Sequence, residues 1–496
     1  MKTSNPSSKP RLSIYGNQDA ALDALFERAG DPRKVLCVPI DFAKRKHCAM
    51  VCDGHGEILK KPFPVHNTPE GIAYLTEQIA ATARHRNIPQ SQIFLGGEDE
   101  PSYVVNFTAE LRRLGYLVMR VNAFQAKESR GNLVANTDQL ALLGIAKTLL
   151  SRRARPSGEA SPGQPVYADL RELTRCRRSQ VREQTATANR IHTLVDQLCP
   201  GFLDASKSGL TPFCAASLEL MQERFSAPEL ARRKPAALAK LLGRHRVHQP
   251  AEVAAKIITL ARGALPPPPA RVASLQRALA AHAELHQCLS HSADALRAEA
   301  AQALATTPYA MLTSIPGIGF VLAAGVAGEL GDPALLGGAD SLCAYAGIVP
   351  RTYQTGGPDS PAVQGRASPR CNRILKDLVV QSAQKIHLYG PPELKDRITR
   401  WNANGQHGIF AGARRYLRLL RSLVKNGVPY LAPAGRGRGA DPDALAAAAQ
   451  DAWQILQQKW RAIPGGPDLI ADEAHPLGFW RRLVTEIHGL HLPARP

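Results

Sequence analysis

The sequence predicts an α/β domain with a mixed sheet, then a long helical arm, then a mostly α-helical C-terminal domain. Over residues 35–150, short apolar runs alternate with helix patterns, which is typical of a sheet covered by helices. Apolar side chains recur at three- and four-residue spacing in residues 168–199 and 270–304, which indicates two long helices. Two long helices of this kind favour an antiparallel hairpin or a coiled coil, with an ordinary helical bundle as the alternative.

The chain of 496 residues is long enough for several domains, and it divides at stretches rich in Gly, Pro, Ser and Arg. The stretch Arg152–Gln164 predicts a hinge, and Gly435–Gly439 predicts a flexible basic linker. The expected parts are a flexible lead-in at 1–33, the α/β domain at 34–151, a helical arm with an insertion at 165–305, the C-terminal domain at 308–431 and a helical tail at 441–496.

Each element of the α/β domain follows from a local pattern. The apolar run from Val35 ends in an acid at Asp41, which predicts a buried strand. Thr68 before Pro69 predicts the start of a helix, because Thr caps free amides and Pro suits the first helical position. The expected strands span 35–41, 47–53, 58–65, 93–97 and 116–121, and the expected helices span 69–84, 104–114 and 138–150.

The charge of the chain favours a polyanionic partner. Lys plus Arg number 62 against 42 for Asp plus Glu, so the formal net charge is +20. A surplus of this size attracts nucleic acid, and the Arg fork suits phosphate. A genome that favours Arg codons is the alternative explanation.

The sequence also bears on location. It has no run of eighteen apolar residues, so we expect no membrane span, and the polar segment Met1–Arg11 lacks the apolar core of a signal peptide. Its nine cysteines are scattered without a CxxC pair, which favours reduced thiols inside the cell.

Three carboxylates stand at the ends of expected elements of the α/β domain. Asp41 ends the first strand, Glu98 follows the strand 93–97, and Asp138 starts the last helix. Strand ends of such a sheet commonly converge on one edge, where ligands bind. Hard cations take oxygen ligands, so the set predicts a magnesium site suited to phosphoryl transfer. Single acids often cap helices or end strands for structural reasons, so the order of the three carries the prediction.

A Gly-rich turn precedes a helix in the C-terminal domain. Residues Ser314–Gly319 read Ser-Ile-Pro-Gly-Ile-Gly and lead into a helix expected at 321–330. Backbone N–H groups around Gly317 and Gly319 can hold a phosphate at a helix N-terminus, and such turns grip DNA backbones without reading sequence. A plain tight turn is the alternative.

A polar loop follows between arginines. Residues 357–369 are rich in Gly, Pro and Ser, and a helix is expected from Ile374. Hydroxyls flanked by guanidinium groups suit binding or attacking a phosphodiester, with a solvated surface loop as the alternative. The predicted nucleic-acid contacts of the whole chain are Lys44, Arg45, Gly317, Gly319, Arg351, Arg366, Arg370 and Arg373.

Together these motifs resemble one family, the DEDD insertion-sequence transposases, also called bridge-RNA recombinases (the IS one-ten family). Val38–Lys44 is similar to the family's first motif, and Glu98 with Tyr103 five residues later is similar to its Glu motif. Asn136–Asp138 stands where the family has Lys-Thr-Asp. The segments that resemble its C-terminal transposase domain are Ser314–Gly319, Tyr345–Arg351, Ser368–Arg373 and Gly412–Tyr430.

The resemblance implies a ribonuclease H-like (RuvC-like) N-terminal domain, a coiled-coil arm, and assembly as a homodimer or homotetramer. It implies Mg²⁺ on an acidic tetrad, and a C-terminal serine that attacks DNA and becomes covalently linked to it. The implied partners are donor DNA, target DNA and a structured guide RNA that pairs with both. The implied location is the bacterial cytoplasm, at the nucleoid.

The sequence departs from the family pattern at two positions. The family's fourth acid lies three residues after its third, whereas this chain has Ala141 there and no Asp or Glu between Asp138 and Glu159. The position of the family serine holds Thr355, which has a hydroxyl on a branched carbon. Extra residues nearby make Ser360 a second candidate nucleophile.

The leading hypothesis is an active, magnesium-dependent transposase or site-specific recombinase. Substitution of its acids and of its candidate hydroxyl nucleophiles would test it most directly. One alternative is a nucleic-acid-binding relative with weak or no catalysis, and another is a metal-dependent nuclease or junction resolvase that uses water. Under the leading hypothesis, the catalytic residues are Asp41, Glu98, Asp138 and Thr355 or Ser360, with Arg351, Arg370 and Arg373 to neutralise charge.

Overall fold

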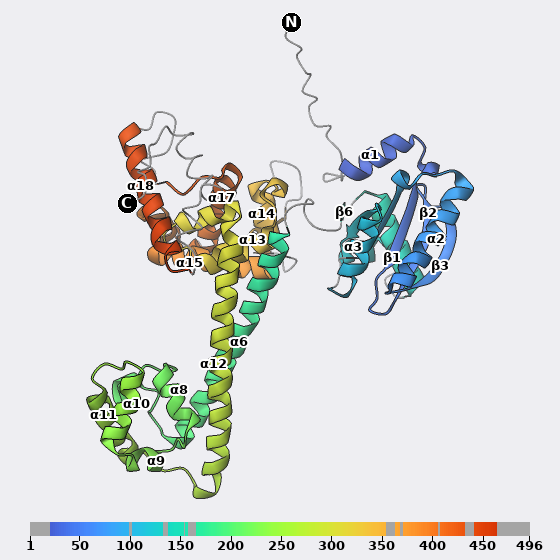
Figure 1. Cartoon of the computed structure of the whole chain (residues 1–496). Coiled ribbons are helices and arrows are strands. Elements are labelled where there is room, and N and C mark those ends of the chain that lie inside the picture. The colour runs from blue at the N-terminus through green and yellow to red at the C-terminus, as the bar shows by residue number, and fades with distance from the viewer. Residues whose placement is uncertain are drawn as a thin grey trace. The chain divides into compact units, whose positions relative to one another are not determined.

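The computed structural model describes residues 20–98, 102–131, 137–152, 154–156, 165–353, 363–367, 371–404, 407–431 and 441–463. These residues fall into two compact units that divide between Glu159 and Ala160 (Figure 1). The first unit contains a large sheet, and the second consists mainly of helices. Each unit has apolar cores of its own.

The first unit is built on a six-stranded sheet with the strand order β3-β2-β1-β4-β5-β6. Strand β2 is antiparallel to β1 and β3, whereas β4 is parallel to both β1 and β5, and β6 is antiparallel to β5. The strands are β1 (Leu36–Asp41), β2 (Lys46–Asp53), β3 (Ile58–His66), β4 (Ile93–Glu98), β5 (Leu117–Val121) and β6 (Arg155–Pro156). This mixed sheet confirms the predicted α/β class and is compatible with a ribonuclease H-like domain.

Helices of the first unit pack on the sheet because side chains alternate between the two faces of a strand. In β1, Val38 and Ile40 share a core with α2 and α3, whereas Cys37 belongs to a second core with α1 and α5. The helices of this unit are α1 (Ala20–Ala29), α2 (Pro69–Arg86), α3 (Val105–Arg113), α4 (Ala123–Ser129) and α5 (Asp138–Leu150).

Helix α1 corrects one expectation, since the segment 1–33 was predicted to be a flexible lead-in. Leu22 and Leu25 are fully buried in the core, and the ring of Phe26 lies 6.1 Å from that of Phe94 on β4. Arg152 also donates to Asp23 at 2.6 Å. The physical reason is the spacing of apolar residues in α1, which presents one face to the sheet.

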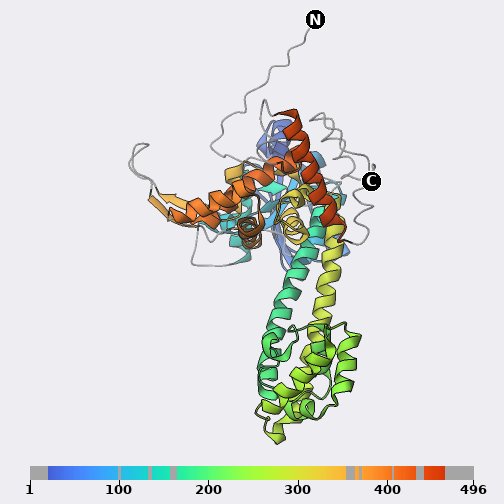
Figure 2. The same cartoon turned by 90° about the vertical axis from the view of Figure 1, so that its left-hand side faces the viewer.

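Two long helices, α6 (Val166–Leu198) and α12 (Pro269–Ala305), dominate the second unit (Figures 1 and 2). They run antiparallel, because Gln180 donates to Ser292 at 2.8 Å while Arg271 donates to Gln197 at 3.3 Å. The predicted pair of long helices is therefore present, and its coiled-coil character stays a prediction. Among the described residues, none of the helices combines the length and the apolar character that crossing a membrane requires.

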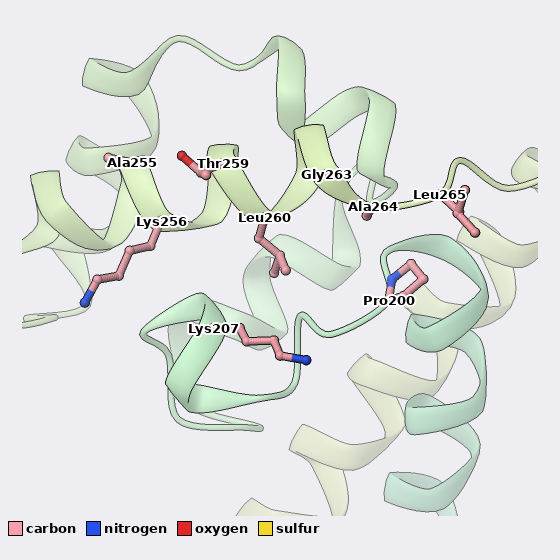
Figure 3. Close-up of a pocket in the computed structure, with 9 residues that line it drawn as sticks. All are labelled: Pro200, Lys207, Ala255, Lys256, Thr259, Leu260, Gly263, Ala264 and Leu265. Carbon is pink, nitrogen blue, oxygen red and sulfur yellow. The ribbon is translucent and has the colours of Figure 1, made fainter.

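The insertion between these helices folds around a separate apolar core. Its helices are α7 (Ala205–Ser208), α8 (Ala215–Gln222), α9 (Ala227–Arg232), α10 (Pro235–Arg244) and α11 (Pro250–Gly263). A pocket of about 670 Å³ lies between α7 and α11, with Leu260 pointing into the space near Lys207 (Figure 3). None of the predicted site residues lines this pocket.

The C-terminal part of the second unit shares one core that includes Tyr309, Tyr416 and Trp460. Its elements are η4 (Pro308–Ser314), α13 (Phe320–Leu330), η5 (Pro333–Leu335), α14 (Ala339–Tyr345), β7 (Pro350–Tyr353), β8 (Val363–Ala367), α15 (Arg373–Tyr389), α16 (Pro392–Ala403), α17 (Gly408–Asn426) and α18 (Pro442–Trp460). Helix α18 lies in the segment expected to be a separate tail, yet it packs into the domain core through Trp453 and Trp460.

Candidate active site

The three predicted acids lie at neighbouring ends of the first unit's central elements. Ile40 pairs with Gly97 between the parallel strands β1 and β4, so the next residues, Asp41 and Glu98, end adjacent strands at the same edge. Asp138 is the first residue of α5, which packs against β1. Thr137 caps this helix by accepting from the Leu140 amide at 3.3 Å, and this cap places Asp138 in the first turn.

Glu98 and Asp138 lie close enough to Asp41 to change the pKa of its carboxyl. Burial raises the pKa of the Asp41 carboxyl, and nearby Glu98 and Asp138 raise it further, whereas Arg130 acts in the opposite direction. The pKa of the Cys48 thiol, opposite Asp41 on β2, is also raised by burial and then by Asp138 and Asp41. Carboxylates that perturb each other in this way carry mutual repulsion that a bound cation relieves.

Arg130 is a site residue that sequence reasoning missed. Its Nη2 lies 3.4 Å from Oε1 of Glu98, and its side chain is only 13% exposed. It follows α4, which approaches α5 closely, since a Cβ on Gly144 would come within 2.3 Å of the Ala126 carbonyl oxygen. No local pattern marks an arginine in this position, because the contact with Glu98 joins residues 32 positions apart.

The donor chemistry of the acids fits a hard divalent cation, which binds carboxylate oxygens. Among the described residues, however, no three His, Cys, Asp or Glu side chains already stand close enough together to hold a metal ion. Glu98 is engaged with Arg130, so a cation at this edge would compete with the guanidinium for that carboxylate. Metal binding by Asp41, Glu98 and Asp138 therefore stays a proposal.

Ala141 occupies the position of the family's fourth acid. It lies one turn after Asp138 on α5 and is 5% exposed. A methyl group there supplies no ligand. The described site thus has three carboxylates where the family pattern has four.

The turn between β1 and β2 carries the predicted nucleic-acid contacts Lys44 and Arg45, and both are exposed. Buried His47 orders this turn, because its Nδ1 accepts from the Ala43 amide at 3.1 Å. The side chain of Asn67 donates to the Lys44 carbonyl at 3.3 Å. The two cations are therefore presented from a hydrogen-bonded turn beside Asp41.

The Gly-rich turn of the second unit lies directly before α13, close to the expected start of that helix. Gly317 has φ +89°, and an added Cβ would meet the Lys385 carbonyl oxygen at 2.7 Å. Gly319 is the N-cap of α13 in an extended conformation, and no described side chain caps that helix end. A Cβ on Gly319 would meet no described atom within 4 Å, so the space beside it is open.

Replacing Gly317 with Ala is expected to destabilise the C-terminal domain by about 2 kcal/mol, because the methyl group meets a backbone oxygen at a positive φ. Gly319→Ala is the matched control and should change the free energy of unfolding by less than about 0.5 kcal/mol. Urea unfolding followed by tryptophan fluorescence measures both, since all four tryptophans lie beyond residue 400. Equal stability of the two variants would contradict this account of the turn.

The polar loop lies largely outside the described residues. Thr355, Ser360 and Arg370 fall there, so their placement stays a prediction. Arg351 and Arg366 lie on the paired strands β7 and β8, but their side chains also fall outside the described set. Arg373 is the exposed first residue of α15.

A buried carboxylate, Glu329 on α13, ties the base of this loop to the long helix α6. Its side chain is 1% exposed and accepts from Arg175 at 2.8 and 3.0 Å. Asn372 donates to it at 2.7 Å and to the Tyr345 hydroxyl at 3.0 Å. The Asn372 side chain also caps α15 by accepting from the Leu375 amide. The segments around Tyr345 and Asn372 were predicted from the sequence, whereas Glu329 and Arg175, which join them, were not.

Two family models match segments that include the residues of both candidate sites. Residues 38–200 match a DEDD family model described as a transposase, and this match gives the class of the protein. Residues 309–398 match the transposase IS116/IS110/IS902 family. The chain therefore belongs to the IS110 family of insertion-sequence transposases. No curated protein matches the chain.

Proposed function

We propose that this transposase cuts and rejoins DNA strands with Mg²⁺ held by Asp41, Glu98 and Asp138, and with a hydroxyl of its C-terminal domain as nucleophile. The observation that carries the proposal is the placement of three carboxylates at neighbouring ends of β1, β4 and α5, where Glu98 and Asp138 raise the pKa of Asp41. Such repulsion favours occupation by a divalent cation. Membership of a transposase family supports a phosphodiester as the substrate.

The proposed chemistry is a displacement at phosphorus. When bound, Mg²⁺ stabilises the negative charge that develops on the phosphate and leaving oxygens. Oγ1 of Thr355 forms a P–O bond while the P–O bond to a deoxyribose breaks, and the released sugar oxygen takes up the proton that the hydroxyl gives up. Attack by a sugar hydroxyl of a second strand then rejoins DNA and frees Thr355. Ser360 is the second candidate for this role.

The proposed partners are donor and target DNA, a structured guide RNA, and further copies of the chain as a homodimer or homotetramer. The net charge of +20 supports polyanion binding, and the exposed cations Lys44, Arg45 and Arg373 would neutralise phosphate charge. The guide RNA, the oligomer and a place at the bacterial nucleoid are supported by the family resemblance. Gly317 and Gly319 would hold a DNA phosphate through backbone amides.

Thr355→Ala is expected to remove the covalent protein–DNA adduct that wild-type protein forms with Mg²⁺ and substrate DNA, whereas Ser360→Ala should retain it. The physical reason is that alanine lacks the attacking oxygen. Denaturing gels with labelled DNA detect the adduct. If only Ser360→Ala lost the adduct, the nucleophile would be Ser360 rather than Thr355.

The same gels separate the two alternatives. Cleavage that survives in both variants without an adduct would indicate a nuclease that uses water. Tight, salt-sensitive binding by wild-type protein with neither cleavage nor adduct would indicate a binding protein that has lost catalysis, as the alanine at position 141 would suggest.

A further inference from the structure

The C-terminal helix α18 lies outside the segments that the family models match, yet it contacts the Gly-rich turn directly. Nζ of Lys459 donates to the carbonyl oxygens of Thr313, Ile315 and Ile318 at 2.6, 3.0 and 2.8 Å. These three acceptors match the three donors of an ammonium group. Two carbonyls of the turn, and that of Thr313 just before it, therefore point toward a single cation.

Trp460, the residue after Lys459, contacts the chain on both sides of the turn. Nε1 of Trp460 donates to Oγ1 of Thr313 at 3.3 Å, and the Trp460 ring packs edge-on against Phe320, with ring centroids 4.8 Å apart. Trp460 is fully buried, so this contact belongs to the core of the domain. Phe320 is the first residue of α13. Helix α18 therefore contacts Thr313 before the turn and Phe320 after it.

The direction of the carbonyls decides where the amides of the turn point. In a trans peptide the C=O of one residue and the N–H of the next point in opposite directions, and all described peptide bonds are trans. The Ile318 carbonyl faces Lys459, so the Gly319 amide faces away from it. The space beside Gly319 is open, as an added Cβ there would meet no described atom within 4 Å.

We propose that Lys459 is a positioning residue that fixes the Ile318–Gly319 peptide so that the Gly319 amide is presented to a DNA phosphate. This inference rests on the proposed role of the turn in backbone binding, and it assigns α18 to that binding element. Burial lowers the pKa of Lys459 to about 8, whereas the carbonyl dipoles favour the ammonium form. At neutral pH the group is charged, so its positive charge also lies behind the amide that meets the phosphate.

The test compares duplex DNA binding by full-length variants over a range of salt concentrations. Lys459→Met should weaken binding about tenfold at fixed salt, without changing the slope of log affinity against log salt, because Lys459 contacts no phosphate. Lys459→Arg, which keeps the charge and donors, should bind more tightly than the Met variant. Lys425→Met removes an exposed lysine of the same domain and is the charge-matched control, expected to bind within about twofold of wild type.

Hydrogen exchange supplies a second readout that a general loss of stability would not reproduce. In Lys459→Met, amides at 315–320 should exchange faster while those of α6 and α12 keep their protection. If this variant does not fold, Lys459→Gln carries the same test with a shorter, neutral donor. A salt slope that falls by about one would make Lys459 a direct phosphate contact and overturn the positioning role.

Gly319→Ala separates this inference from the proposed function on which it rests. The variant should fold normally but hinder the approach of a phosphate to the amide. If Gly319→Ala weakens DNA binding and Lys459→Met does not, the role of Lys459 is wrong and the turn remains the binding element. If neither variant weakens binding, the turn does not hold DNA and the proposed function fails at this site.

Discussion

Asp41→Asn is expected to reduce Mg²⁺-dependent DNA strand cleavage and exchange by at least about a thousandfold while leaving DNA binding intact. Asn has nearly the shape of Asp, but its amide group lacks the charge that a hard cation requires. Asp41 is the central acid of the site, because its pKa responds to both Glu98 and Asp138. Strand exchange with labelled donor and target DNA measures the effect, and a filter or gel-shift assay measures binding.

Glu110→Gln is the matched control for this experiment. Glu110 belongs to the same unit and forms an exposed pair with Arg113 at 2.6 Å on α3. Its replacement should leave strand exchange within about twofold of wild type. Full exchange activity in Asp41→Asn would refute the metal site, whereas equal loss in both variants would point to damage of the whole domain.

Glu329→Gln should destabilise the C-terminal domain by about 2 kcal/mol. The Glu329 carboxylate accepts three hydrogen bonds, two from Arg175 and one from Asn372. An amide in its place turns one acceptor into a donor that faces other donors, inside a site where the side chain is 1% exposed. The partial exposure of Arg175 limits the loss, since water can solvate the released guanidinium. Urea unfolding monitored by tryptophan fluorescence gives the difference in free energy.

The pH dependence of stability provides a second signature of Glu329. Burial raises its pKa, but hydrogen bonds from Arg175 and Asn372 outweigh burial and hold the pKa below its ordinary value of 4.5. The stabilisation is therefore fully present above about pH 4.5 and is lost as the pH falls through the lower pKa of the folded state. Wild type should lose this increment in acid, and Glu329→Gln should not.

Asp340→Asn is the control for both measurements on Glu329. Asp340 pairs with Arg418 at 3.2 Å, but its side chain is 90% exposed. Removing its charge should change the free energy of unfolding by less than about 0.5 kcal/mol. An effect at Asp340 as large as at Glu329 would show that burial is not what makes Glu329 important.

Local patterns predicted the elements that carry the acids. The strand from Val35 to Asp41 and the helix that starts at Asp138 are present close to their expected ends, because apolar runs and caps act over a few residues. The same type of signal was available for α1, where Leu22, Leu25, Phe26 and Ala29 follow helical spacing. This spacing predicts a helix as directly as the patterns of the other elements do, so the expectation of a flexible lead-in was wrong for residues 20–29.

The residues that sequence reasoning missed act through contacts between distant segments. Arg130 reaches Glu98 across 32 positions, Arg175 reaches Glu329 across 154, and Lys459 reaches Thr313 across 146. A single sequence carries no periodicity that links such pairs. Each is a cation that comes within hydrogen-bonding distance of its partner only when the chain folds.

The sequence by itself determined the α/β class, the order of the acids, the Gly-rich turn and the likeness to a transposase family. These features depend on residue type and on spacing along the chain, which the sequence states directly. The tertiary structure alone decided that Asp41, Glu98 and Asp138 share one electrostatic neighbourhood with Arg130, and that α18 supports the turn at Gly319. Coulomb interactions and hydrogen bonds depend on distance in space, and only packing brings these segments of the chain together.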